Sequence, residues 1–223
     1  TEPSLCWVLV LACDTFSLSI RENVMKIIVL LFLCALVASC ASVAPSRGLS
    51  GYENVELKPW IYGAQAVSGV TFSYAAPASI GNDLGYCVAQ HVSNRQVDVK
   101  DDSQSYFGAY TGNYYRVERS RSVDGGEVIM YASKDGASVA AQGSAVYQLP
   151  GMIPVDKVIR FNMALSNKEG KTEYVFSNIE VAQLDTGIIS NSGFQPLGAH
   201  KQASPELALN ALKAIAEKIQ GCI

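Results

Sequence analysis

Two neighbouring segments in the second half of the chain alternate apolar and polar residues, and they restrict the fold more than any other feature. In the predicted strand at residues 157–166, every second side chain from Ile159 to Leu165 is apolar, and polar residues such as Asn162 lie between them. The next residues, Asn-Lys-Glu-Gly, have the composition of a tight turn, and a second strand is predicted at residues 172–181. This spacing predicts an antiparallel hairpin that is covered on one face.

Further strands and a first helix are predicted from shorter patterns. Alternating runs predict strands at residues 70–74, 127–132 and 138–149, each beside turn-forming residues. Apolar residues recur at helical spacing from Ile80 to Val92, which predicts an amphipathic helix of about four turns.

A second helix is expected near the end of the sequence. Ser204 is the predicted N-cap, Pro205 takes the first helical position, and Gly221 ends the helix. Together these elements predict a two-layer α+β domain, with a mainly antiparallel sheet and two helices packed on one face.

Charge and composition exclude two broad classes of protein. The 223 residues carry 17 basic and 20 acidic side chains, a formal net charge of -3. A nucleic-acid partner is therefore not expected, because such a surface needs clustered Lys and Arg. With 49% hydrophobic and only 17% charged residues, extensive disorder is not expected either.

An export signal is predicted ahead of the folded part. From Met25 the chain has one cation at Lys26, an apolar run at residues 27–37, and small residues up to Ser39, directly before Cys40. These are the three regions of a secretory signal, and the run is too short to span a bilayer comfortably.

The end of this signal resembles the lipobox of bacterial lipoproteins, in the tetrad Val37-Ala38-Ser39-Cys40. The resemblance implies cleavage between Ser39 and Cys40, attachment of diacylglycerol to the Cys40 sulfur, and acylation of the new amino terminus with a fatty acid such as palmitate. Several acyl chains anchor a protein stably. Residue 41 is Ala rather than the Asp associated with inner-membrane retention, so the resemblance favours the outer membrane, with the domain in the periplasm. The alternative is an apolar stretch that merely ends in cysteine.

Four regions are predicted along the chain. Residues 1–24 are interpreted as an upstream extension or an artefact of start-site choice, with a long signal n-region as the alternative, and residues 25–39 as the signal peptide. Residues 40–59 comprise the acylated cysteine and a flexible tether rich in Ser, Gly and Pro. Residues 60–223 are the single α+β domain.

Two segments of that domain resemble an uncharacterised family of bacterial envelope proteins with a TATA-box-binding-protein-like fold. Residues 138–144 (SVAAQGS) resemble the family's strand that ends in glycine, and residues 169–179 (EGKTEYVFSNI) resemble its hairpin. The resemblance implies a fold for residues 67–220 and supplies no activity, and the name of the fold implies no DNA binding.

Catalytic and metal-binding patterns are not found in the sequence. Its histidines, His91 and His200, are far apart and lack paired spacing, and we interpret His91 as a packed structural residue. The sequence therefore predicts no enzyme, no metal and no cofactor.

Cys87 and Cys222 are a candidate disulfide pair. With Cys40 acylated, they are the two cysteines left in an oxidising compartment, one in each predicted helix, and two helices on one sheet face could bring them together.

The segment at residues 105–115, SYFGAYTGNYY, has the composition of an adaptable binding loop. The candidate contact residues are Tyr106, Phe107, Tyr110, Tyr114 and Tyr115. The alternative is a β-hairpin whose tyrosines cover the sheet, with its turn at residues 111–113.

The leading functional hypothesis is a lipid-anchored envelope protein whose non-catalytic domain binds another envelope protein or a glycan, or assists assembly. The alternatives are an envelope hydrolase with an unrecognised site, in which His91 or His200 meets a carboxylate, and an accessory lipoprotein of a phage or mobile element.

Overall fold

The computed structural model describes residues 44–77 and 83–223. The predicted signal, Ser39 and Cys40 lie outside the described residues, as do Ile80 and Gly81 of the first predicted helix. The strands are β1 Val55–Pro59, β2 Gln65–Ala75, β3 Val97–Asp101, β4 Tyr106–Phe107, β5 Tyr114–Tyr115, β6 Arg119–Val123, β7 Ile129–Ala132, β8 Ser138–Leu149, β9 Val155–Lys168, β10 Lys171–Gln183 and β11 Gln195–Pro196. The helical segments are the 3-10 turns η1 Arg47–Gly51, η2 Ile61–Gly63 and η3 Lys201–Ala203, and the α-helices α3 Leu84–His91 and α4 Pro205–Gln220.

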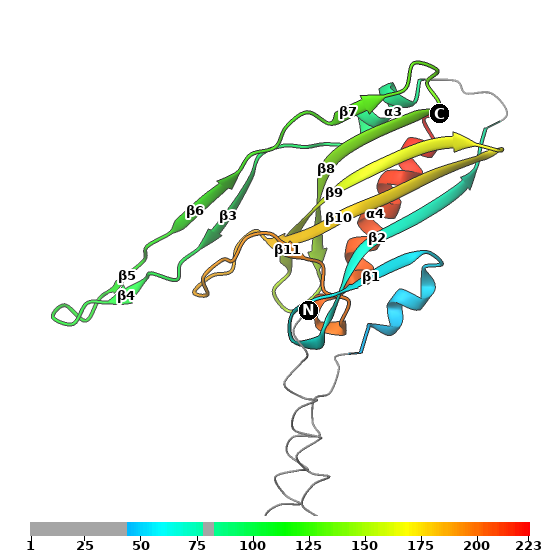
Figure 1. Cartoon of the computed structure of the whole chain (residues 1–223). Coiled ribbons are helices and arrows are strands. Elements are labelled where there is room, and N and C mark those ends of the chain that lie inside the picture. Colours follow the sequence, from blue (N-terminus) through cyan, green and yellow to red (C-terminus); the bar gives the residue numbers. More distant parts are fainter. Residues whose placement is uncertain (1–43, 78–82) are drawn as a thin grey trace, which may run out of the picture. The chain divides into compact units, whose positions relative to one another are not determined.

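The domain has the predicted α+β composition, and its sheet is mainly antiparallel. Its main sheet has seven strands in the order β1-β2-β10-β9-β8-β7, and β11 pairs with β10 (Figure 1). β9 and β10 form the predicted hairpin, in which Lys168 pairs with Lys171. Glu169 and Gly170 have φ angles of 52° and 74°, the left-handed backbone that a tight two-residue hairpin turn requires.

Helix α4 packs against the apolar side of the sheet. The alternating residues of β9 that were predicted to be covered, such as Phe161 and Met163, are buried in one core with Leu209 and Leu212 of α4. α4 contacts β2, β8 and β10. Ser204, the predicted N-cap of this helix, makes no side-chain capping hydrogen bond, because it adopts a left-handed φ of 49°.

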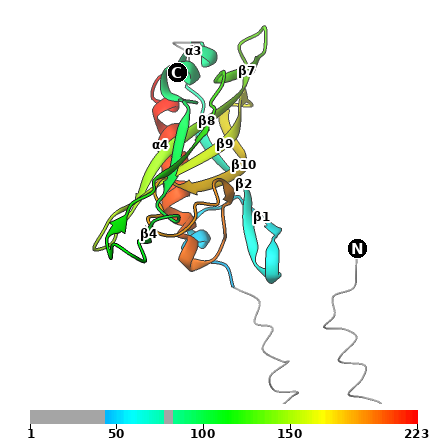
Figure 2. The ribbon, with the colours of Figure 1, turned by 90° about the vertical axis from the view of Figure 1, so that its left-hand side faces the viewer.

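The first predicted helix is shorter than expected. α3 comprises 8 residues, two turns rather than four, and begins after Asp83. The Asp83 carboxylate accepts hydrogen bonds from the backbone N–H groups of Gly85 (2.6 Å) and Tyr86 (3.3 Å), so it fixes the start of the helix. α3 lies beside the C-terminal end of α4 in both views (Figures 1 and 2).

The prediction of a tether over residues 40–59 is wrong for the described part of that segment. η1 packs against α4, and β1 forms an edge of the sheet by pairing with β2. Leu49 is buried in the core, and the Tyr52 hydroxyl donates to Asn210 Oδ1 over 2.7 Å. A segment poor in apolar residues is therefore ordered by contacts with residues far away in the sequence.

Candidate functional site

Residues 97–123 form an arm that extends away from the main sheet (Figure 1). At its root β3 pairs with β6, and at its tip β4 pairs with β5. The root is held by a small apolar cluster, in which Val99 of β3 packs with Val158 and Ala182 of the main sheet. We call residues 97–123 the aromatic arm.

The turn at the tip of the aromatic arm is closed by its own backbone. Gly108 N–H donates to the Asn113 carbonyl (2.9 Å), and Gly112 N–H donates to the Gly108 carbonyl (2.8 Å). Gly112 has a φ of 65°, which glycine adopts without strain. The turn therefore includes residues 111–113, as the hairpin alternative placed it.

The predicted contact residues come together as two cross-strand pairs. Tyr106 stacks on Tyr115, with ring centroids 5.3 Å apart, and Phe107 contacts Tyr114 at 5.2 Å. Adjacent residues of a strand face opposite sides, so each side of the ribbon carries one aromatic pair. Tyr110 lies in the turn and is fully exposed.

These rings do not cover the sheet, which corrects the hairpin alternative. The segment is a hairpin, but Phe107 is 73% exposed and all five predicted contact residues are exposed. Exposed aromatic rings gathered on a protruding ribbon are available for contact with a partner.

Polar contacts connect the aromatic arm to the loop after β10. The Asp101 carboxylate accepts hydrogen bonds from the Ser103 hydroxyl and from the Asn191 N–H. These bonds, that of Ser103 first, hold the pKa of the Asp101 carboxyl below its ordinary value. Arg116 Nε and Asp102 Oδ2 form an ion pair of 2.8 Å near the tip. Both partners belong to the arm, and a solvent-screened pair of this kind contributes at most about 1 kcal/mol.

The two histidines belong to different elements, and neither is paired with a carboxylate in the described part of the chain. His91 ends α3 and His200 precedes η3, and neither forms a hydrogen bond or ion pair with a carboxylate within residues 44–77 and 83–223. In the same part of the chain, no group of three or more His, Cys, Asp or Glu residues could hold a metal ion.

Cys87 of α3 and Cys222, after α4, are joined by a disulfide, with their Cα atoms 5.7 Å apart. This separation is ordinary for such a bond. Cys40 lies outside the described residues, and none of the described helices is long and apolar enough to cross a membrane.

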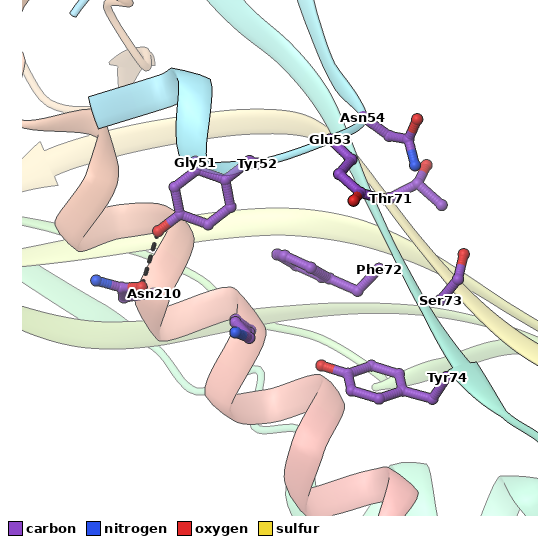
Figure 3. Close-up of a pocket in the computed structure, with 10 residues that line it drawn as sticks. Gly51, Tyr52, Glu53, Asn54, Thr71, Phe72, Ser73, Tyr74 and Asn210 are labelled. Atoms are coloured by element: carbon purple, nitrogen blue, oxygen red, sulfur yellow. Dashed lines mark hydrogen bonds between the residues drawn. The ribbon is translucent and has the colours of Figure 1, made fainter. Parts of the chain in front are cut away.

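An open pocket of about 490 Å³ lies beside β2 and was not predicted from the sequence. Its lining includes Tyr52, Phe72 and Tyr74, whose rings point toward α4, together with Asn210 and Lys213 of that helix (Figure 3). These residues come from three separate segments, so only the assembled fold shows the pocket.

Comparison with known proteins gives little further information. No protein-family model matches the chain, and no curated protein matches it. Among solved structures, the chain is similar to a DUF4468 family protein from Bacteroides ovatus, at 8% sequence identity and a TM-score of 0.32. The match covers 80% of this chain and 84% of that one. At this TM-score the likeness does not establish a shared fold, so function is inferred from the chain's own residues.

Proposed function

We propose that this protein is a non-catalytic binding module of the bacterial envelope and that the aromatic arm contacts a partner protein. The observation that carries the proposal is the exposure of five aromatic residues on a ribbon that protrudes from the sheet. The cross-strand pairs hold four of the rings in place before binding, which reduces the conformational entropy lost on association.

A protein partner is favoured over a glycan by the arrangement of the rings. Both sides of the ribbon carry an aromatic pair, so a ribbon inserted into a groove of a partner protein would contact both walls of that groove. A sugar ring instead stacks on aromatic rings that lie on one side. Tyrosine is also the residue type that contributes strongly at the centres of protein interfaces.

The test is a pull-down from crosslinked envelope of native cells with the wild-type protein and a variant carrying Tyr106, Tyr110 and Tyr114 each changed to Ala. We expect at least one captured protein to be lost with this variant. A matched control changes Tyr86 and Tyr131, which are exposed outside the aromatic arm, and should retain that protein. Identical partner lists for all three proteins would contradict the proposal, and retention on purified peptidoglycan instead would indicate a glycan ligand.

The lipid anchor at Cys40 is the second part of the proposal. The signal-like segment from Met25 and the lipobox-like tetrad support acylation at Cys40. Ala41, in place of the Asp associated with inner-membrane retention, supports placement in the outer membrane, with the domain in the periplasm. Metabolic labelling with a palmitate analogue tests it, because Cys40→Ala should abolish the label. Equal label in the variant would exclude Cys40 as the acylated residue.

The finer description of the fold belongs to the same proposal. Contacts of α4 with β2, β8 and β10, and of α3 with β8 and α4, support a two-layer arrangement with both helices on one face of the sheet. The strand β8 and the hairpin β9–β10 occupy the segments that resemble the uncharacterised envelope family with the TATA-box-binding-protein-like fold, which supports that resemblance.

A further inference from the structure

Half of strand β2 has an open edge. β1 pairs with β2 only as far as Val70, while β10 follows the other side of β2 to Ala75. No strand among residues 44–77 and 83–223 pairs with residues 71–75 on the β1 side. β1 reaches no further along β2 because it begins at Val55, directly after the turn at residues 53–54 that follows η1.

Backbone hydrogen-bonding groups face this open edge. Thr71 N–H donates to the Asn54 carbonyl over 3.0 Å, so Thr71 points its backbone toward the β1 side. Residues two apart on a strand point the same way, so the N–H and C=O of the exposed Ser73 face the same edge. At the far end, Gln220 Nε2 donates to the Ala75 carbonyl over 3.1 Å and closes the edge.

The side of this edge that faces α4 is aromatic. The open pocket of about 490 Å³ there is lined by Tyr52, Phe72 and Tyr74 (Figure 3). Polar side chains of Glu53, Asn210 and Lys213 complete its rim. Tyr52 and Phe72 contact edge to face, with centroids 6.4 Å apart. The Tyr74 hydroxyl is buried and has no hydrogen-bond partner among the described residues. Burial first, and the Glu217 carboxylate second, raise the pKa of Tyr74 above its ordinary value.

The opposite side of the edge is acidic. A second open pocket, of about 510 Å³, is lined by Glu53, Glu56 and Glu173 together with Thr71 and Ser73, and by no basic residue. Because Ser73 pairs with Glu173 in the sheet, their side chains share this face. Among the described residues these three carboxylates form no ion pair.

We propose that the open edge of β2 binds an extended peptide as an additional strand, with apolar side chains toward α4 and basic side chains toward the three glutamates. A strand alone supplies N–H and C=O groups at the spacing of the edge and side chains that alternate between two faces. Because Asn54 and Gln220 already occupy the Thr71 N–H and the Ala75 carbonyl, the bound segment pairs mainly with Ser73. It spans at most residues 71–75, about 17 Å. This site shares no residue with the aromatic arm, so it goes beyond the function proposed above.

A second copy of the chain is a poor occupant of this edge. In an edge-to-edge dimer related by a two-fold axis, the acidic faces of both copies would lie on the same side of the joined sheet. The three glutamates of each copy would then repel those of the other. Charged residues beside an edge are a common means of preventing such pairing. The same carboxylates attract a basic strand.

The test uses fluorescent peptides of six alternating residues and the full domain at low salt. A Lys-Val peptide should bind, and a Glu-Val peptide of the same length should not. A Lys-Val peptide that is N-methylated on the residues facing the edge should lose binding, because it cannot donate to β2. In amide NMR spectra, the Lys-Val peptide should shift the resonances of Ser73 and Ala75.

Protein variants separate this site from the aromatic arm. Changing Glu53, Glu56 and Glu173 to Gln should weaken binding of the Lys-Val peptide about tenfold at low salt, since each exposed charge pair contributes modestly. The triple Tyr variant of the aromatic arm should bind the peptide unchanged. Equal binding by the Gln variant, binding of the N-methylated peptide, or shifts confined to residues 106–115 would each overturn the proposal. Dimerisation in sedimentation experiments that Ser73→Pro abolishes would instead assign the edge to a second copy.

Discussion

Gly143 lies where the covered face of the sheet leaves no room for a side chain. It lies in β8, and a Cβ atom at this position would be 2.4 Å from Val92 Cγ1 and 3.2 Å from the Ser93 carbonyl oxygen. Val92 is buried, and its branched side chain has little freedom to rotate away. A backbone carbonyl cannot move without disturbing the chain beyond α3.

Gly143→Ala is therefore expected to lower the free energy of unfolding by about 1 to 3 kcal/mol, as overpacking does in other cores. Urea unfolding followed by circular dichroism measures this loss. Gly51→Ala is the matched control, because nothing lies within 4 Å of its Cβ position, and it should change stability by less than about 0.5 kcal/mol. Equal losses in both variants would show that the contact with Val92 is relieved without strain.

Asp101 provides a test of pH dependence. Its pKa is lowered in the folded protein, by the Ser103 hydroxyl first, so the stability it adds is present above the unfolded value of about 3.9 and is lost as the pH falls through the folded value. The difference in unfolding free energy between wild type and Asp101→Asn should be constant above about pH 5 and should shrink below about pH 4. A difference that grows on acidification would contradict the assigned hydrogen bonds.

Elements with a regular pattern of apolar residues were predicted from the sequence, whereas elements ordered by distant contacts were missed. The bounds of β8 match the predicted strand at residues 138–149, because turn-forming residues flank it, Asp135 and Gly136 before it and Pro150 and Gly151 after it. β1 and η1 were missed because their order comes from β2 and α4 rather than from their own composition. α3 was predicted too long because the helical spacing of apolar residues already begins at Ile80, ahead of Asp83, which caps the start of the helix.

The two α-helices should respond differently to loss of the residue before them. Asp83→Ala removes two hydrogen bonds to α3 and should lower stability by about 1 kcal/mol, whereas Ser204→Ala removes none from α4. Ser204→Gly should raise stability by about 0.5 to 1 kcal/mol, since glycine adopts the left-handed backbone found there without strain. Thermal unfolding of the three variants measures the order of their stabilities. A larger loss of stability in Ser204→Ala than in Asp83→Ala would show that Ser204, and not Asp83, is the stabilising cap.

For the molecule as a whole, the candidate sites were only partly predictable. The aromatic residues of the arm were identified from composition, but whether they cover the sheet depends on where the hairpin points. The β2 edge was not identified, since it is defined by the absence of a neighbouring strand among the described residues and by glutamates from two distant segments. Such a surface exists only after the chain has folded.

The disulfide links residues separated by 135 positions, so it restricts the unfolded chain strongly. Changing Cys87 and Cys222 to Ala should lower the free energy of unfolding by about 2 to 5 kcal/mol. Reductant should destabilise the wild type to a similar extent and should leave the double variant unchanged. If both thiols of the wild type are alkylated without reductant, the bond is not formed in solution.

The strand order has a kinetic consequence. β8, β9 and β10 are joined by short connections and can pair early, whereas β2 must find β10 across about 100 residues, since Tyr74 pairs with Thr172. Until β2 pairs with β10, the backbone edge of β10 is unpaired. Other chains can then pair with this edge of the three-stranded sheet. We expect the slowest step of folding to be the arrival of β2, so conditions that delay it favour aggregation.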